Sequence, residues 1–148
     1  MLIAAIVGAL AAVLVGMGGA NVFDELLRYW RRAIRRRVDD PDRRAAGQAK
    51  LDEFEHEAAA MAADLRGWVQ SFAEVHRRYA STPADYDQLA DRLVEEFYPA
   101  QMRLVELADE LRRAIGDSAY TEITDDVEKR LRAARERKLR REAKSTSR

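Results

Sequence analysis

The chain has 148 residues, no cysteine, and 26 basic and 26 acidic side chains. This length suits a single domain, and the lack of cysteine excludes disulfides and thiolate metal sites. The charges are unevenly distributed: residues 28–44 carry a net charge of +5, residues 45–127 carry −10, and residues 128–148 carry +7.

The first 23 residues contain no charged side chain. A membrane-spanning helix needs about 20 apolar residues, so residues 1–23 are predicted to form a transmembrane helix that is retained as a signal anchor. A secretory signal peptide usually begins with a positively charged n-region, and this segment has no Lys or Arg at its start, which argues against a signal peptide. The small residues Gly18, Gly19 and Ala20 nevertheless offer a cleavage point, so a cleaved signal peptide is the alternative.

Small residues recur at every fourth position of this segment and would lie on one face of a helix. They are Ala4, Gly8, Ala12, Gly16 and Ala20. Such a stripe lets two helices approach closely in lipid. It therefore predicts association of the membrane helix and a homo-oligomer.

Basic and aromatic residues follow the predicted span, and we assign them to the membrane interface. They are Arg28, Tyr29, Trp30, Arg31, Arg32, Arg35, Arg36 and Arg37. Positive charge near a span is retained on the cytoplasmic side, and aromatic rings favour the interface. We therefore expect a single-pass protein of the inner (cytoplasmic) membrane, with lipid as a direct partner and the C-terminal part in the cytoplasm.

Residues 24–44 are predicted to form a basic, amphipathic juxtamembrane segment. The apolar side chains at its start and within it follow helical spacing: Phe23, Leu26, Leu27, Trp30, Ile34 and Val38. The segment either continues the membrane helix or lies on anionic lipid. Asp40 as a cap and Pro41 at the first helical position predict that a new helix starts there.

Residues 45–131 are predicted to form an antiparallel three-helix bundle with coiled-coil-like packing. The expected core of its first helix repeats at intervals of three and four residues: Leu51, Phe54, Ala58, Met61, Leu65, Trp68, Phe72, Val75 and Tyr79. Thr82 and Pro83 predict the start of the second helix, with Asp85 completing a capping box. Pro99 predicts a kink or a break in that helix, and Gly116 predicts its end.

Residues 132–148 are predicted to fray into a basic tail, because few apolar side chains remain there to be buried. Its cations include Arg135, Arg137, Lys138, Arg140 and Arg141. Clustered cations attract phosphate groups, but the tail lacks interleaved aromatic residues and any nucleic-acid-binding motif. Lipid or an acidic protein is therefore favoured over nucleic acid as its partner.

No catalytic, cofactor-binding or metal site is predicted. Glu53 and His56 have the spacing of one half of a carboxylate di-metal site, but Ala73 stands where a glutamate should precede His76. The serines are not part of a nucleophile elbow. These observations predict a protein that is not an enzyme.

Taken with the predicted all-α fold, these features predict a single-span bacterial membrane protein whose cytoplasmic bundle is a self-associating scaffold or adaptor for a protein partner that the sequence does not identify. One alternative is a periplasmic or envelope-spanning bundle, acting in binding, stress sensing or phage lysis, whose N-terminal segment is cleaved or oppositely oriented. A second alternative is a membrane-tethered nucleic-acid binder that uses the basic tail. The arginines after the span favour the cytoplasmic scaffold.

Overall fold

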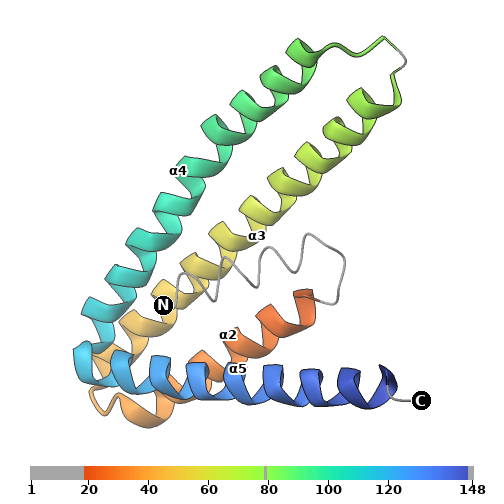
Figure 1. Ribbon diagram of the computed structural model, residues 1–148. Helices are drawn as coiled ribbons and strands as arrows, with labels where there is room; N and C mark the ends of the chain where they lie inside the picture. Colours follow the sequence, from red (N-terminus) through yellow and green to blue (C-terminus); the bar gives the residue numbers. More distant parts are fainter. Residues whose placement is uncertain (1–18, 79, 147–148) are drawn as a thin grey trace.

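Four helices account for nearly all of the part of the chain that the computed structural model describes, residues 19–78 and 80–146. They are α2 (Gly19–Arg37), α3 (Pro41–Arg77), α4 (Pro83–Ile115) and α5 (Asp117–Thr146). No strand occurs among these residues, so the predicted all-α class is confirmed. α3 and α4 form a long antiparallel hairpin, and α2 and α5 cross its base (Figure 1).

The ends of the hairpin helices are fixed by local polar contacts. The Asp40 carboxylate accepts hydrogen bonds from the backbone N–H groups of Asp42 and Arg43, at 2.8 and 3.0 Å, and thereby caps α3. At the start of α4, the Asp85 carboxylate accepts from the backbone N–H and the hydroxyl of Thr82, at 2.7 and 2.9 Å. The start of both helices is therefore as predicted.

Pro99 lies inside α4, which continues as one helix on both sides of it. Of the two predicted outcomes, a kink or a break, the break does not occur. Phe97 and Ala100 pack against the core on either side of the proline, and Leu104 is buried one turn later. These contacts with the rest of the protein hold the flanking turns in place, which offsets the lost backbone hydrogen bond.

The hydrophobic core lies at the base, where all four helices meet. Its buried members include Phe23, Leu27, Trp30 and Ile34 of α2; Val38 directly after α2; Leu51, Phe54, Ala58, Met61 and Ala62 of α3; Leu104, Leu107, Leu111 and Ile115 of α4; and Ile123 and Val127 of α5. The fold therefore differs from the expected three-helix bundle, because α2 is a fourth helix of the same core. Helical spacing identifies an apolar face but not the surface that it packs against, which explains the difference.

Two glycines allow the helices to meet at the base. A Cβ at Gly47 of α3 would overlap Cγ2 of Ile115, so only glycine permits this close approach of α3 to the end of α4. Gly116 separates α4 from α5 and has φ 88° and ψ 150°. This backbone conformation is essentially restricted to glycine, and it lets the chain turn sharply between the two helices.

The distal half of the hairpin, beyond α2 and α5, consists of two helices only (Figure 1). Side chains of α3 that were expected in the core are therefore less buried here. Leu65 is still buried, Trp68 and Val75 are half-buried, and Phe72 is 41% exposed. Trp68 still links the two helices, because its indole Nε1 donates a hydrogen bond to the backbone oxygen of Leu89 at 2.9 Å. Tyr79 lies outside the described residues.

α5 continues as a helix to Thr146. The segment after Leu131 is therefore helical, where a frayed tail was expected. Good helix formers dominate this segment, so local propensity favours a helix even where few apolar side chains can be buried.

Within the described part of the chain, no helix has a stretch long and apolar enough to cross a membrane. The predicted span at residues 1–23 lies mostly outside the described residues, as do Ala4, Gly8, Ala12 and Gly16 of the small-residue stripe. Ala20 lies in the first turn of α2.

Candidate functional site

α2 and α5 run antiparallel, which brings together two basic segments that are far apart in the sequence. Near the end of α2, Arg37 forms ion pairs with Glu122 and Asp126 of α5. Closer to the start of α2, the Tyr29 hydroxyl donates to Asp126 at 3.2 Å, and the Arg130 guanidinium lies 4.5 Å from the centre of the Tyr29 ring. Residues 122–137 of α5 therefore lie next to residues 25–37 of α2, where the two helices cross (Figure 1).

A groove of about 500 Å³ lies between the two helices, along residues 25–32 of α2 and 127–137 of α5. Its charged side chains are four arginines, two from each helix, and one glutamate: Arg28, Arg32, Arg130, Arg137 and Glu25. Its apolar part consists of Leu26, Tyr29, Val127 and Leu131. We call this site the α2–α5 groove.

The four arginines of the α2–α5 groove are exposed, and none forms an ion pair with a residue that the structure describes. Other arginines of α2 are engaged: Arg31 pairs with Asp52 and Glu55 of α3, and Arg37 pairs with Asp126. A guanidinium is always charged and presents several N–H donors in a fork that matches a phosphate or a carboxylate. The groove is therefore suited to an anion, and its apolar part to a ligand that also has hydrocarbon.

Asp126 of α5 forms polar contacts with α2 beside this groove. Its pKa is lowered, first by the hydrogen bond from Arg37 and further by the one from Tyr29, while partial desolvation opposes the shift. The carboxylate therefore stays ionised at neutral pH and binds α5 to α2 at that level. This pairing neutralises Arg37 and leaves the net positive charge on the four arginines of the groove.

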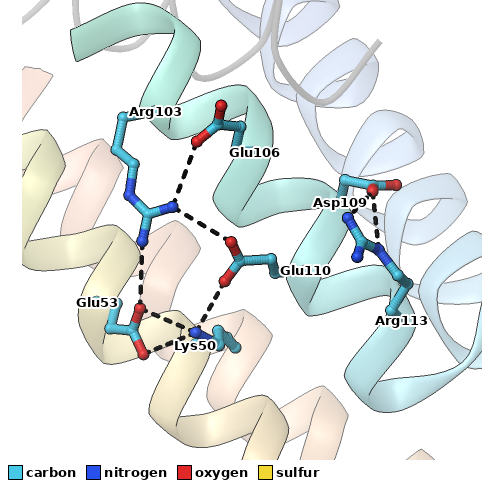
Figure 2. A network of polar contacts seen from close by, with 7 residues as sticks. All are labelled: Lys50, Glu53, Arg103, Glu106, Asp109, Glu110 and Arg113. Carbon is cyan, nitrogen blue, oxygen red and sulfur yellow. Dashed lines mark hydrogen bonds and ion pairs between the residues drawn. The ribbon is translucent and has the colours of Figure 1, made fainter. Parts of the chain in front are cut away.

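A second polar cluster, shown in Figure 2, has a different character. Lys50 and Glu53 of α3 face Arg103 and Glu110 of α4, with Lys50 at 2.8 Å from Glu110 and Arg103 at 3.2 Å from the same carboxylate. The hydrogen bond from Lys50 is the main cause that lowers the pKa of Glu110. Cations and carboxylates satisfy one another here, so this cluster binds α3 to α4 and has little capacity left for a ligand.

Exposed apolar side chains form a third surface, along the hairpin. Five of the six large ones among the described residues lie on α3 and α4: Val69, Phe72, Val94, Tyr98 and Met102. Val94, Tyr98 and Met102 follow one another at intervals of four and share one side of α4. Val69 lies about five helical turns after Leu51 and therefore on the face of α3 that α2 covers at the base. We call these five residues the hairpin apolar surface.

The structure distributes the predicted interface residues among several environments. Arg28 and Arg32 line the α2–α5 groove, Arg35 and Arg36 are exposed, and Arg31 and Arg37 are paired within the protein. Trp30, expected at the membrane interface, is only 3% exposed, and its ring lies 5.5 Å from that of Tyr120. The apolar face of α2 is thus used by the protein core and is not available to lie on lipid.

The residues of the predicted basic tail, and those of the predicted bundle core, also lie in several different environments. Among the tail residues, Arg137 lines the groove, and Arg135, Lys138, Arg140 and Arg141 lie on α5. Leu51, Phe54 and Met61 belong to the buried core at the base, Leu65 is buried farther along the hairpin, and Phe72 is exposed. Arg130 was not singled out from the sequence. Its position three residues after Val127, on an amphipathic helix, is the signal that could have placed it beside the buried face.

The chain matches no protein-family model, no curated protein and no solved structure.

Proposed function

We propose that this protein is a non-enzymatic, membrane-anchored scaffold or adaptor. In this proposal the uncharged residues before Phe23 anchor the chain, since Phe23 itself belongs to the protein core. The base formed by α2 and α5 lies next to the membrane, and the α3–α4 hairpin extends from it toward a protein partner or a second copy.

The observation that carries the proposal is the convergence of two basic segments, one of which comes directly after the uncharged segment in the sequence. The antiparallel arrangement of α2 and α5 brings residues 127–137 of α5 next to residues 25–32 of α2, which begin two positions after the uncharged segment ends at Phe23. Positive charge next to a span is the signal for cytoplasmic retention, and it also favours contact with anionic lipid. The cytoplasmic side of the inner membrane is therefore the proposed location of the base.

The hairpin supports the scaffold role. Its distal half has two helices rather than four, and it exposes Val94 and Tyr98 to 65% and 61%. With Met102 they form a row of large exposed apolar side chains at intervals of four on α4, and a continuous apolar surface of this kind is typical of a site that another protein covers. We propose self-association or adaptor binding through this part.

Topology is the most direct test, and the lack of native cysteine makes it simple. We would introduce Ser145→Cys in the full chain and label cells with a membrane-impermeant thiol reagent, before and after permeabilisation. Leu2→Cys serves as the matched variant for the opposite side. The proposal predicts that the cysteine at 145 is labelled only after permeabilisation, and the one at 2 in intact cells.

The same samples should show an intact N-terminus by mass spectrometry. Labelling at position 145 in intact cells, or loss of residues 1–20, would place the helices outside the cytoplasm. Either result would support the periplasmic or envelope-spanning alternative instead.

A further inference from the structure

We propose that the α2–α5 groove binds the phosphate headgroup of an anionic phospholipid. This inference deepens the proposed function and rests on it for the identity of the ligand. It assigns the groove as a built lipid site, as distinct from a general attraction between basic residues and a charged membrane.

The charge arrangement favours an anion. Arg28 and Arg32 approach the groove from α2, and Arg130 and Arg137 approach it from α5, with Glu25 as the only acidic residue among its described lining. Like charges on two packed helices repel, and no described carboxylate forms an ion pair with any of these four arginines. An anion between the helices would relieve this repulsion and accept hydrogen bonds from both sides.

The apolar part of the groove distinguishes the ligand class. Leu26, Val127 and Leu131 contribute aliphatic surface, and Leu131 is 38% exposed. A phosphodiester attached to a glycerol and acyl chains can cover such surface, whereas inorganic phosphate cannot.

Nucleic acid is a weaker candidate for the same charges. Single-stranded nucleic acid is bound largely by stacking of bases on exposed aromatic rings. Tyr29 is the only aromatic side chain of the groove, and one face of its ring is already covered by Arg130 at 4.5 Å. The groove therefore lacks a stacking platform.

The position of the groove matches the level of lipid headgroups. Its α2 lining, residues 25–32, begins two positions after the uncharged segment ends at Phe23. An anchored chain holds this groove at high effective concentration relative to the headgroups.

The test uses the full chain in nonionic detergent micelles, in which the effect of one lipid can be isolated. Increasing amounts of phosphatidylglycerol are added, with phosphatidylcholine in parallel, and the apparent affinity is obtained from the rise in Tm. The groove variant is Arg28→Gln with Arg137→Gln, which removes one cation from each helix. The matched control is Arg35→Gln with Arg36→Gln, which removes two exposed cations of α2 that do not line the groove.

We expect phosphatidylglycerol to raise Tm and phosphatidylcholine to have little effect. Each cation near an anionic lipid contributes substantially to affinity, so the groove variant should weaken the response about tenfold or more. The control should bind nearly as well as the unmodified chain. Circular dichroism of both variants separates loss of binding from loss of fold.

Several results would overturn the assignment. Equal loss in both variants would mean diffuse attraction rather than a site. An equal effect of inorganic phosphate would make the groove a free-anion site, and stronger stabilisation by a DNA oligonucleotide would favour nucleic acid. Because these measurements do not depend on topology, the groove can bind lipid even if thiol labelling refutes the cytoplasmic location, and the reverse also holds.

Discussion

At the scale of single residues, Gly47 has a specific role in the packing of the base. A methyl group at this position would overlap Cγ2 of Ile115 and lie 3.5 Å from Cγ2 of Ile34. Both contacts involve β-branched side chains in the core, which have little freedom to move away. Gly67, one of the exposed positions of the same helix, has no atom near the corresponding methyl position.

This difference predicts opposite effects for the same substitution in one helix. Gly47→Ala should destabilise the protein by about 1 kcal/mol, because overpacking outweighs the gain in helix propensity. Gly67→Ala should stabilise it by about 1 kcal/mol, because only the propensity gain applies. Thermal unfolding of the two variants, monitored by circular dichroism, tests this. A stabilised Gly47→Ala variant would show that α3 does not approach Ile115 so closely.

Asp126 provides a residue-level prediction about pH. Its pKa is lowered in the folded state by the hydrogen bonds from Arg37 and Tyr29. A lowered carboxylate pKa gives stabilisation that is present above the ordinary aspartate pKa of about 3.9, and that is lost as pH falls through the folded pKa. Asp126→Asn should therefore lower Tm at pH 7, and the difference from the unmodified chain should shrink below about pH 4.

A suitable control is Asp91→Asn, since Asp91 is exposed on the distal half of the hairpin and forms no ion pair with a described residue. Its effect on Tm should be small at every pH. The unmodified chain should keep some acid sensitivity from other carboxylates with lowered pKa, such as Asp40 and Glu110. A Tm difference for Asp126→Asn that stays constant from pH 7 to pH 3 would contradict the proposed pairing.

At the scale of elements, α4 contains a proline in its interior, where helix geometry disfavours this residue. Pro99 is exposed, so its side chain is not required by the core. Pro99→Ala restores a backbone donor and removes the clash with the preceding turn, so it should stabilise the protein by up to about 3 kcal/mol. Pro83→Ala is the matched control, because proline at the first helical position costs nothing. Urea unfolding of both variants measures the difference, and equal midpoints would argue against a strained α4.

Elements also show how much of this fold could be predicted from sequence. The starts of α3 and α4 were predicted from Asp40 and Thr82, because capping depends on residues that are close in the chain. The apolar register of α2 was predicted as well. Its burial against α3, α4 and α5 was not, since periodicity does not identify the partner of an apolar face. The α2–α5 groove depends on that pairing, so only half of its arginines, Arg28 and Arg32, were grouped together beforehand.

At the scale of the whole molecule, the two ends of the hairpin have different physical properties. The base buries a four-helix core and carries the α2–α5 groove, whereas the distal half exposes the hairpin apolar surface. The positively charged base is suited to contact with anionic lipid, and the exposed apolar side chains of the distal half are suited to contact with another protein. The chain therefore carries a basic surface and an exposed apolar surface on opposite parts of a single fold.

This polarity predicts where self-association takes place. If copies associate through the hairpin apolar surface, Val94→Gln with Tyr98→Gln should weaken association of the full chain in detergent by about tenfold or more, since each buried large side chain contributes about 1.5–3 kcal/mol. Sedimentation equilibrium measures the association constant. Leu131→Gln, an exposed apolar position on α5, serves as the control and should leave the constant nearly unchanged. Gly8→Leu with Gly16→Leu tests the small-residue stripe in the same experiment. Loss of association only in this last variant would assign the contact to the N-terminal segment and leave the hairpin apolar surface to a different protein.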